Sequence, residues 1–158
     1  MSAPPLDALR WRWCRFDELD VHELDAIYRA RQQVFAVEQN CPFVDADGLD
    51  PVSWHLAAWD AGPPEVPLAY ARVVSPGRKY AEASIGRVIT TAAARGTGLG
   101  RALMRRAIAA CERTFPGHGI RISAQSRLER FYAELGFQVV GAPYLEDDIP
   151  HIEMLRRG

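Results

Sequence analysis

The sequence predicts a mixed α/β fold in a single domain over residues 1–158, with the element order β-α-β-β-β-α-β-α-β-β. Short segments in which apolar residues alternate with polar ones indicate strands, and longer segments with a period of 3.6 residues indicate helices. Three of the strands follow one another directly, which excludes the strict alternation of a doubly wound parallel sheet. At 158 residues the chain is long enough to bury a core without disulfides or a structural metal.

The N-terminal third is expected to form a strand, a helix and a loop. Leu9, Trp11 and Trp13 alternate with arginines, which is typical of a half-buried strand. Asp20 and Glu23 form a capping-box pattern ahead of apolar residues at helical spacing, so a helix is predicted over 20–36. The next segment, up to residue 53, has the composition of a loop rich in carboxylates, and such loops often determine specificity.

The middle of the chain predicts three strands and a long helix. Apolar runs at 54–59 and 68–74 indicate an antiparallel hairpin with a long turn, and a third strand is expected over 83–90. A helix with one apolar face is predicted from 98 to 115 and ends at a Pro-Gly pair.

The C-terminal third predicts a strand over 120–124, a helix over 126–135 and two short strands over 137–140 and 151–155. Gly136 stands just after the predicted helix, where a left-handed backbone commonly ends a helix.

Composition narrows the classes of function. The formal net charge of −1 argues against non-specific binding of nucleic acid, which needs a basic surface. No apolar run approaches the ~20 residues that span a bilayer, so no membrane association is expected. Three widely spaced cysteines are typical of free thiols in a reducing compartment, and a cytoplasmic location is expected. No spacing among the four histidines suggests a metal site.

A glycine-rich segment at 95–100 lies between a predicted strand and a predicted helix. A turn of this kind directs bare backbone N–H groups and the positive end of a helix dipole at a phosphate, so it predicts a phosphate-bearing cofactor. The glycine spacing does not fit the dinucleotide-binding fingerprint, and no Gly-Lys-Ser/Thr follows as in a nucleotide P-loop. The alternative is a tight turn before a packed helix.

Two motifs resemble the GNAT superfamily of N-acetyltransferases. Arg95, Gly98 and Gly100 match the Arg-x-x-Gly-x-Gly pattern of its acyl-CoA pyrophosphate loop. The run 125–137, with Tyr132 followed by a Gly-Phe pair, is similar to the later signature of the superfamily. The segments 34–43, 45–48, 85–88 and 149–152 further resemble the ElaA-like branch, so the resemblance covers nearly the whole chain.

The resemblance implies the GNAT fold and acetyl-CoA as co-substrate. It implies direct transfer of the acetyl group to a primary amine in a ternary complex, without a covalent enzyme intermediate. The backbone of strand 88–90 would follow the pantetheine arm, if that strand is bulged or splayed, and the amides of the glycine-rich loop would surround the pyrophosphate. The residues implied in cofactor binding are Val88, Ile89, Thr90, Arg95, Gly96, Thr97, Gly98, Leu99, Gly100, Arg101 and Gln125.

Two residues are the leading catalytic candidates. Tyr132 matches the general acid of the family, which protonates or hydrogen-bonds the departing thiolate; the alternative is an aromatic core residue. An amine with a pKa near ~10.4 must lose a proton before attack, so a base is needed. Glu38 is a candidate base or substrate anchor, and its alternative is a solvated carboxylate at a helix end.

Other charged residues keep two interpretations each. Glu82 stands at the edge of the strand where many relatives carry a glutamate base. His55 and His151 could titrate near neutral pH or be structural. The carboxylates of two segments could line the mouth of the acceptor site or be merely solvated; they are Asp45, Asp47, Asp50, Glu146, Asp147 and Asp148. Four arginines could contact CoA phosphates or face water; they are Arg105, Arg106, Arg127 and Arg130.

The expected partner is a small-molecule or peptide amine, and a homodimer is a further possibility. Two other classes of function remain open. An acyl-CoA-binding sensor would retain the cofactor loop without the chemistry, and a structural subunit of an assembly would bind no CoA.

Overall fold

Four antiparallel strands form the first sheet in chain order. In the computed structural model, which describes residues 4–60 and 66–158, these are β1 (Arg10–Arg15), β2 (Ser53–Trp59), β3 (Ala69–Val74) and β4 (Ser84–Thr90). The predicted hairpin of β2 and β3 is confirmed, with Leu56 opposite Ala71. Its predicted turn falls largely on residues 61–65, outside the described residues.

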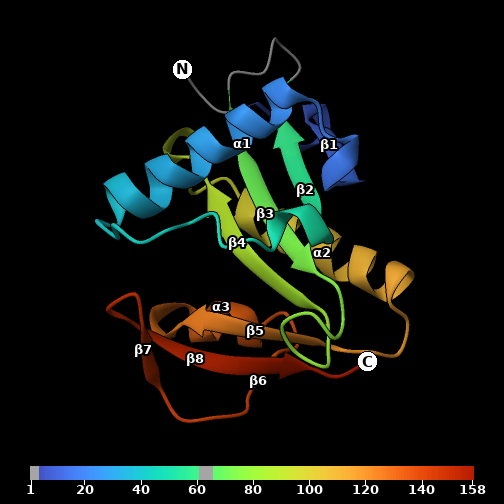
Figure 1. The fold of residues 1–158 in the computed structure, drawn as a ribbon, viewed down its shortest axis with the longest axis vertical. Coiled ribbons are helices and arrows are strands. Elements are labelled where there is room, and N and C mark those ends of the chain that lie inside the picture. The colour runs from blue at the N-terminus through green and yellow to red at the C-terminus, as the bar shows by residue number, and fades with distance from the viewer. Residues whose placement is uncertain (1–3, 61–65) are drawn as a thin grey trace.

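One face of this sheet is covered by α1 (Val21–Gln32), seen above the sheet in Figure 1. The predicted capping box is confirmed, because the Glu23 amide donates to the Asp20 carboxylate at 2.7 Å. The helix continues into a π-helical turn over Gln33–Glu38, which the sequence did not predict. Small and apolar residues of α1 pack on the sheet; they are Ala26, Ile27 and Ala30 against Ala57, Trp59 and Tyr70.

The opposite face is covered by α2 (Leu99–Thr114), the helix predicted over 98–115. Its apolar face includes Leu103, Met104 and Ala107, which are fully buried. They belong to the larger core cluster, together with Leu56, Ala58 and Ala71 of the sheet. Alternate residues of β2 therefore face the two helices, as the period of two along a strand requires.

The second sheet holds β5 (Ile120–Gln125), β8 (Ile149–Arg156) and β6 (Gln138–Val139), with β7 (Tyr144–Glu146) also paired to β8. The strand β7 adds one element to the predicted order. The helix predicted over 126–135 consists of a 3₁₀ turn, Ser126–Leu128, and a short α3 (Glu129–Ala133). Gly136 has a φ of +93°, which confirms the predicted left-handed position.

The two sheets are joined at one end. A parallel bridge pairs Ala83 with Ile120, and the Arg121 amide donates to the Ala83 carbonyl at 2.8 Å. Beyond this bridge, no further pairing joins β4 to β5 in the described part of the chain. The strands of the two sheets diverge from this end, as Figure 1 shows.

A β-bulge interrupts β4 on the side of β3. Tyr70 pairs with Ile89 while Arg72 pairs with Gly86. The single residue Ala71 of β3 therefore stands opposite two residues of β4, Arg87 and Val88. Of these two, Arg87 has a φ of +50°. A bulge bends and twists its strand locally. The expected pairing of 88–90 with a pantetheine arm required a bulged or splayed strand, and β4 has such a bulge.

Candidate active site

Two cavities lie against β4 and meet. The first opens between β4, β5, β7 and β8, and the second lies between β4, the π-helical turn, the start of α2 and α3. Both are lined by the same four residues, Gln39, Val88, Leu128 and Tyr132. These four residues therefore mark the place where a ligand in one cavity comes nearest to a ligand in the other.

The second cavity is lined by five of the eleven residues expected to contact a cofactor, whereas Gly96, Thr97, Gly98, Leu99, Arg101 and Gln125 do not line it. Val88, Ile89 and Thr90 of β4 line it, together with Arg95 and Gly100 from the glycine-rich loop. Because β4 is the last strand of its sheet, the backbone groups on its outer edge have no ladder partner among the described residues beyond the bridge at its start. Such an edge can pair with an extended polar ligand.

The start of α2 leaves its first amides open. Gly98 is the N-cap with a φ of +85°, no side chain caps the helix, and its first turn holds no acidic residue. Gly96, with a φ of +77°, is likewise surrounded by open space. The first N–H groups of a helix lack intrahelical partners and attract anions. The first amides of α2 therefore have no side-chain cap, and a Cβ atom at Gly96 or Gly98 would meet no neighbour within 4 Å.

Other residues of this loop use their side chains elsewhere. Thr97 donates its hydroxyl to the Ala94 carbonyl at 2.5 Å, and Leu99 is buried in the core. Arg101 pairs with Glu134 of the segment after α3 at 2.7 Å. The side chain of Leu99 is therefore not available to a ligand, although its backbone is. The side chain of Arg101 links the start of α2 to the segment after α3.

Arg95 and Glu38 form an ion pair inside the second cavity. The Arg95 Nη2 lies 2.5 Å from the Glu38 Oε1 and also donates to the Thr90 carbonyl at 2.9 Å. Glu38 is the last residue of the π-helical turn, so this turn carries its carboxylate toward the cofactor loop. Glu38 lines the second cavity and does not line the first.

Tyr132 belongs to the core and to both cavities. Only 7% of its surface is exposed, and its ring lies edge-on to Phe131 and Phe137 at centroid distances of 5.1 and 6.0 Å. Burial raises the pKa of Tyr132 to about 12, against the opposing effect of Arg127. The hydroxyl therefore stays protonated across the physiological range and can serve as a hydrogen-bond donor.

The first cavity has a polar face built by the second sheet. Gln125 of β5 stands opposite His151 of β8, and Tyr144 of β7 stands on the other side of His151. The Gln125 amide donates to the Gln39 side chain at 3.2 Å. Gln125 thus lines the first cavity and reaches the shared residues, but it does not line the second cavity, where a cofactor was expected to meet it.

His151 is held in this polar face by two contacts. Its Nδ1 lies 2.7 Å from the Ile149 carbonyl, and its Nε2 lies 3.4 Å from the Glu146 Oε2. The residue is 7% exposed, whereas Glu146 is exposed. The sequence offered His151 as a candidate without indicating this carboxylate, because β7 was not predicted.

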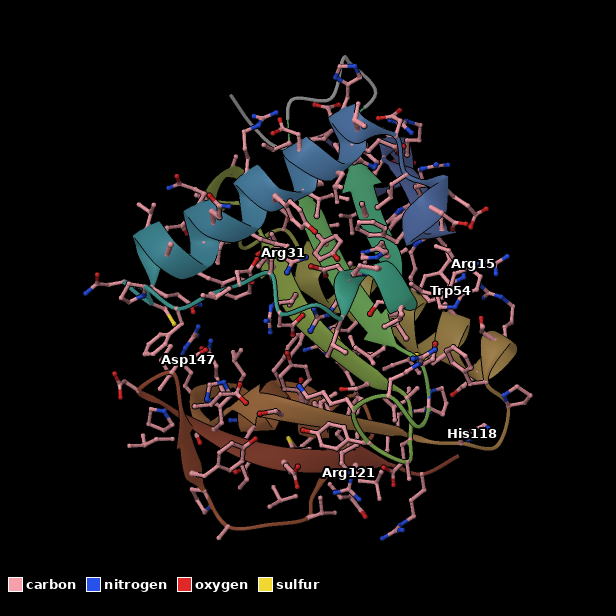
Figure 2. All side chains as sticks on the ribbon, in the orientation of Figure 1. Arg15, Arg31, Trp54, His118, Arg121 and Asp147 are labelled. Atoms are coloured by element: carbon pink, nitrogen blue, oxygen red, sulfur yellow. The ribbon has the colours of Figure 1, made fainter. Side chains whose placement is uncertain are left out.

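The loop carboxylates Asp45, Asp47 and Asp50 are all paired with arginines, and Asp50 is buried, so they are not merely solvated as the expectation favoured from the sequence had it. Arg31 bonds Asp45 at 2.8 Å and Asp50 at 2.9 Å, and Arg72 bonds Asp47 at 2.7 Å. Figure 2 shows Arg31 beneath α1, between the helix and the sheet. The arginines are distant in sequence, so only the folded chain reveals the pairs.

This cluster is held in its charged form. Burial opposes ionisation of Asp47 and Asp50, but the hydrogen bonds and charges of Arg31 and Arg72 outweigh it and lower the pKa of both carboxyls. Arg87 of the bulge joins the cluster, with its Nε 2.8 Å from Asp45. The cluster fixes the loop after the π-helical turn onto β3 and β4, where that loop forms one wall of the first cavity.

His55 is structural. It is 2% exposed, with Nδ1 2.7 Å from the Tyr70 hydroxyl and Nε2 3.0 Å from the Asp50 carbonyl. Burial lowers the pKa of His55, so the ring is neutral at physiological pH. It lines neither cavity.

The remaining charged candidates divide between the site and the surface. Arg127 lines the second cavity. Arg106 lies over the Trp11 ring at 4.5 Å, and Glu82 pairs with Arg121 at 3.0 Å; neither lines a cavity. Arg130 pairs with Glu134 at 3.7 Å. Of the acidic residues 146–148, Glu146 and Asp147 line the first cavity.

All three cysteines are free thiols. Cys41 lines the first cavity, and burial raises its thiol pKa. Burial also raises the pKa of Cys111 to about 12. Thiols with raised pKa values are poor nucleophiles because little thiolate is present. Among residues 4–60 and 66–158, no three His, Cys, Asp or Glu side chains are grouped as metal ligands, and no helix has the length and apolarity needed to cross a bilayer.

Comparisons with known proteins agree with this geometry. Residues 66–157 match the model of the acetyltransferase (GNAT) domain. The chain is 42% identical over 149 residues to the protein sll0451 of Synechocystis, covering 94% of this chain and 96% of that one. A solved acyl-CoA N-acyltransferase from Pseudomonas aeruginosa matches with a TM-score of 0.88 and 44% identity, over 94% of this chain and 99% of the other.

The protein ElaA of Escherichia coli is similar in both sequence and structure. It is 37% identical over 150 residues, covering 94% of this chain and 96% of ElaA. Its crystal structure matches with a TM-score of 0.87, over 94% of this chain and 99% of that one. The similarity therefore extends over both sheets and both cavities.

Proposed function

Because this chain belongs to the GNAT acetyltransferase family, whose co-substrate is an acyl-CoA, we propose that it transfers an acetyl group from acetyl-CoA directly to a primary amine. The observation that carries the proposal is the meeting of the two cavities at Val88 and Tyr132. A donor in one cavity and an acceptor in the other would bring the thioester and the amine together at this place. Holding two reactants in such an arrangement removes much of the entropic barrier to reaction.

The second cavity is assigned to acetyl-CoA. The open amides of 96–101 would bind the pyrophosphate, whereas the Arg95 amide donates to the Ala92 carbonyl at 3.3 Å. The outer edge of 88–90 would pair with the pantetheine arm. A backbone N–H near the bulge would then donate to the thioester oxygen as negative charge develops on it. Glu38 is assigned here as an anchor, because its carboxylate holds Arg95 at 2.5 Å.

The transfer step needs a donor for the leaving group. The amine nitrogen forms a bond to the carbonyl carbon, the carbon–sulfur bond breaks, and the thiolate departs. Tyr132 would donate its hydroxyl hydrogen to that sulfur, since a phenol with a pKa of about 12 remains protonated until then. Direct transfer is favoured over an acyl-enzyme because the pKa of the Cys41 thiol in the first cavity is raised.

The first cavity is assigned to the acceptor, a small molecule or a peptide that carries a primary amine. Glu146 and Asp147 line it and favour a cationic amine. A cytoplasmic location and a homodimer remain predictions.

The deciding test measures thiol release from acetyl-CoA with a panel of polyamines, amino sugars, amino acids and amino-terminal peptides, for the wild type and Tyr132→Phe. We expect release above the no-enzyme background, with turnover falling ~100-fold in the variant and acetyl-CoA affinity by calorimetry unchanged. Equal turnover would remove Tyr132 from the acid role. Tight binding of acetyl-CoA without turnover across the panel would favour a sensor.

A further inference from the structure

We infer that His151, supported by Glu146, is the general base that takes the proton from the acceptor amine. The inference rests on the proposed function and goes further than it, because it assigns the step that the proposed function leaves without a residue.

The position of His151 suits contact with an acceptor. It lies on the central strand of the second sheet, and its side chain lines the first cavity together with Gln125 and Tyr132. The cavity reaches Val88, where the thioester is proposed to lie. A base in this cavity faces the amine from the side opposite the cofactor loop. Glu38, the other candidate base, lies in the cofactor cavity and is engaged by Arg95.

The hydrogen of the neutral ring is fixed by the backbone. A carbonyl oxygen can only accept, so the 2.7 Å contact with Ile149 requires the hydrogen to be on Nδ1. The lone pair is then on Nε2, which is the atom that takes up a proton. This arrangement, in which one ring nitrogen donates to a carbonyl, sets the tautomer of a functional histidine.

Glu146 is placed to stabilise the protonated ring. Its Oε2 lies 3.4 Å from Nε2 of His151, a distance at which the carboxylate forms an ion pair with the ring once the ring carries the transferred proton. Glu146 is exposed, and so the proton can pass from His151 to Glu146 and then to solvent. His151 thus removes a proton from the ammonium form of the acceptor before the nitrogen attacks. The nitrogen loses its second hydrogen after the carbon–nitrogen bond has formed, and this proton restores the hydroxyl of Tyr132, which has given its own hydrogen to the thiolate.

The other titratable groups around His151 bear on its protonation. Tyr144 stacks on the ring at a centroid distance of 6.1 Å, and burial raises the pKa of Tyr144, so it is neutral. On β5, the residue opposite it is the uncharged Gln125, and Ser123, two residues before Gln125, stands opposite Glu153 of β8. The remaining ionisable groups that line the cavity are Cys41, Asp45, Lys79, Arg87, Tyr132 and Asp147. Of these, Asp45 and Arg87 pair with each other at 2.8 Å.

The first measurement needs no acceptor. Long-range ¹H–¹⁵N spectra of the ¹⁵N-labelled full chain, with His151→Gln to assign the signal, report which ring nitrogen carries the hydrogen. We expect the neutral ring of His151 to carry it on Nδ1. A ring with its hydrogen on Nε2 would overturn the inference and would leave the proposed acetyl transfer standing.

The second measurement is the pH dependence of kcat with the most active amine of the panel. We expect His151→Gln to lower kcat ~100-fold and to abolish the fall in activity on the acid side, with acetyl-CoA affinity unchanged. Glu146→Gln should lower kcat by less than His151→Gln does, because Glu146 acts on the amine only through the ring that it contacts at 3.4 Å.

The matched control is His118→Gln. His118 is exposed and lies at the far end of the molecule from Asp147, a residue of the first cavity, as Figure 2 shows. This variant should retain the wild-type profile. A wild-type profile in His151→Gln would overturn the inference while turnover by the wild type supports the proposed function. Absence of turnover by the wild type would overturn both.

Discussion

At the scale of single residues, the contact between Glu38 and Arg95 changes the role that is expected of Glu38. Glu38 occupies the end of a helical segment, where a solvated carboxylate is the common case. In the structure it lies 2.5 Å from Arg95, which also bonds the Thr90 carbonyl at 2.9 Å. The pair connects the π-helical turn to the strand and loop assigned to acetyl-CoA. Its expected effect is therefore on cofactor binding.

We predict that Glu38→Gln raises KM for acetyl-CoA about 3- to 10-fold and leaves kcat and its pH dependence close to wild type. The neutral amide cannot hold the Arg95 guanidinium by charge, so the loop loses part of its preorganisation. Steady-state kinetics with varied acetyl-CoA would measure this. Arg95→Gln should have a similar effect, and the double variant should be no worse than either single one, because both remove the same contact. A large fall in kcat for Glu38→Gln alone would assign the base role to Glu38.

Among single residues, those in local motifs could be predicted from the sequence, and those with distant partners could not. The candidate roles of Tyr132 and of the glycine-rich loop follow from local motifs, and the structure brings both to the edge of β4. The pairing of Asp47 and Asp50 with arginines more than 18 residues away along the chain depends on the fold. Charge patterns in a loop carry no information about such distant partners, so these carboxylates were expected to be solvated.

At the scale of elements, the start of α2 is a feature whose backbone matters more than its side chains. Gly98 has a φ of +85° and open space around it, so the absence of a side chain leaves the helix amides accessible. We predict that Gly98→Glu abolishes measurable acetyl-CoA binding in calorimetry. The new carboxylate would repel the pyrophosphate and occupy the open end of the helix.

The matched control is Gly117→Glu, beyond the other end of the same helix. Gly117 has a φ of +80° and open space, so the replacement imposes a comparable backbone strain. This variant should be destabilised to a similar extent and should bind acetyl-CoA like the wild type. Similar loss of binding in both variants would attribute the effect to strain in the helix and would contradict the proposed pyrophosphate site.

The buried ion pairs of Asp50 with Arg31 and Arg72 hold the loop after the π-helical turn in place. All three side chains are at most 2% exposed. Removing one partner leaves buried charge without compensation, and we predict that Asp50→Asn lowers the free energy of unfolding by about 3 kcal/mol or more. Urea unfolding would measure it. Asp25→Asn breaks an exposed pair with Arg29 and should cost less than about 1 kcal/mol.

The pH dependence of stability follows from the same pairs. The folded pKa values of Asp47 and Asp50 lie below the unfolded value of ~3.9. Their contribution is therefore complete above that value and is lost as the pH falls through the folded pKa values. The wild type should lose stability steeply below about pH 4, and Asp50→Asn should lose less over this range. Equal slopes for the two proteins would contradict this assignment.

Element boundaries show why strands of the second sheet were harder to predict than those of the first. β2 and β3 are almost wholly buried and produce continuous apolar runs. β7 is three residues long and entirely exposed, so its residues produce no apolar pattern. It exists because it pairs with β8, as in Tyr144 opposite His151. The missed strand is also the one that supplies Glu146 to the proposed base.

At the scale of the whole molecule, the fold is two sheets that meet at Ala83 and Ile120 and diverge beyond this bridge. The element order, except for β7, was predictable from periodicity, and a bulged or splayed strand was a condition of the role that the family resemblance implied for 88–90. The division into two sheets is a property of long-range pairing, which local patterns do not report. The proposed substrates occupy the space that this division leaves, so binding should couple the two sheets.

We predict that acetyl-CoA slows amide hydrogen exchange in both sheets, whereas ADP slows it only near the start of α2. ADP carries a pyrophosphate for the open amides of 96–101 but has no arm to pair with 88–90 or to reach Tyr132, which lines both cavities beside the second sheet. Acetyl-CoA would span all three, and local opening of each segment would then require its release. At a concentration of about 100 times Kd, the protection should approach ~2.7 kcal/mol for segments that open only in the unbound protein. Mass-spectrometric exchange with both ligands at matched saturation would measure it. Equal protection patterns for ADP and acetyl-CoA would mean that the pantetheine arm does not lie along β4, and the assignment of the second cavity would then be wrong.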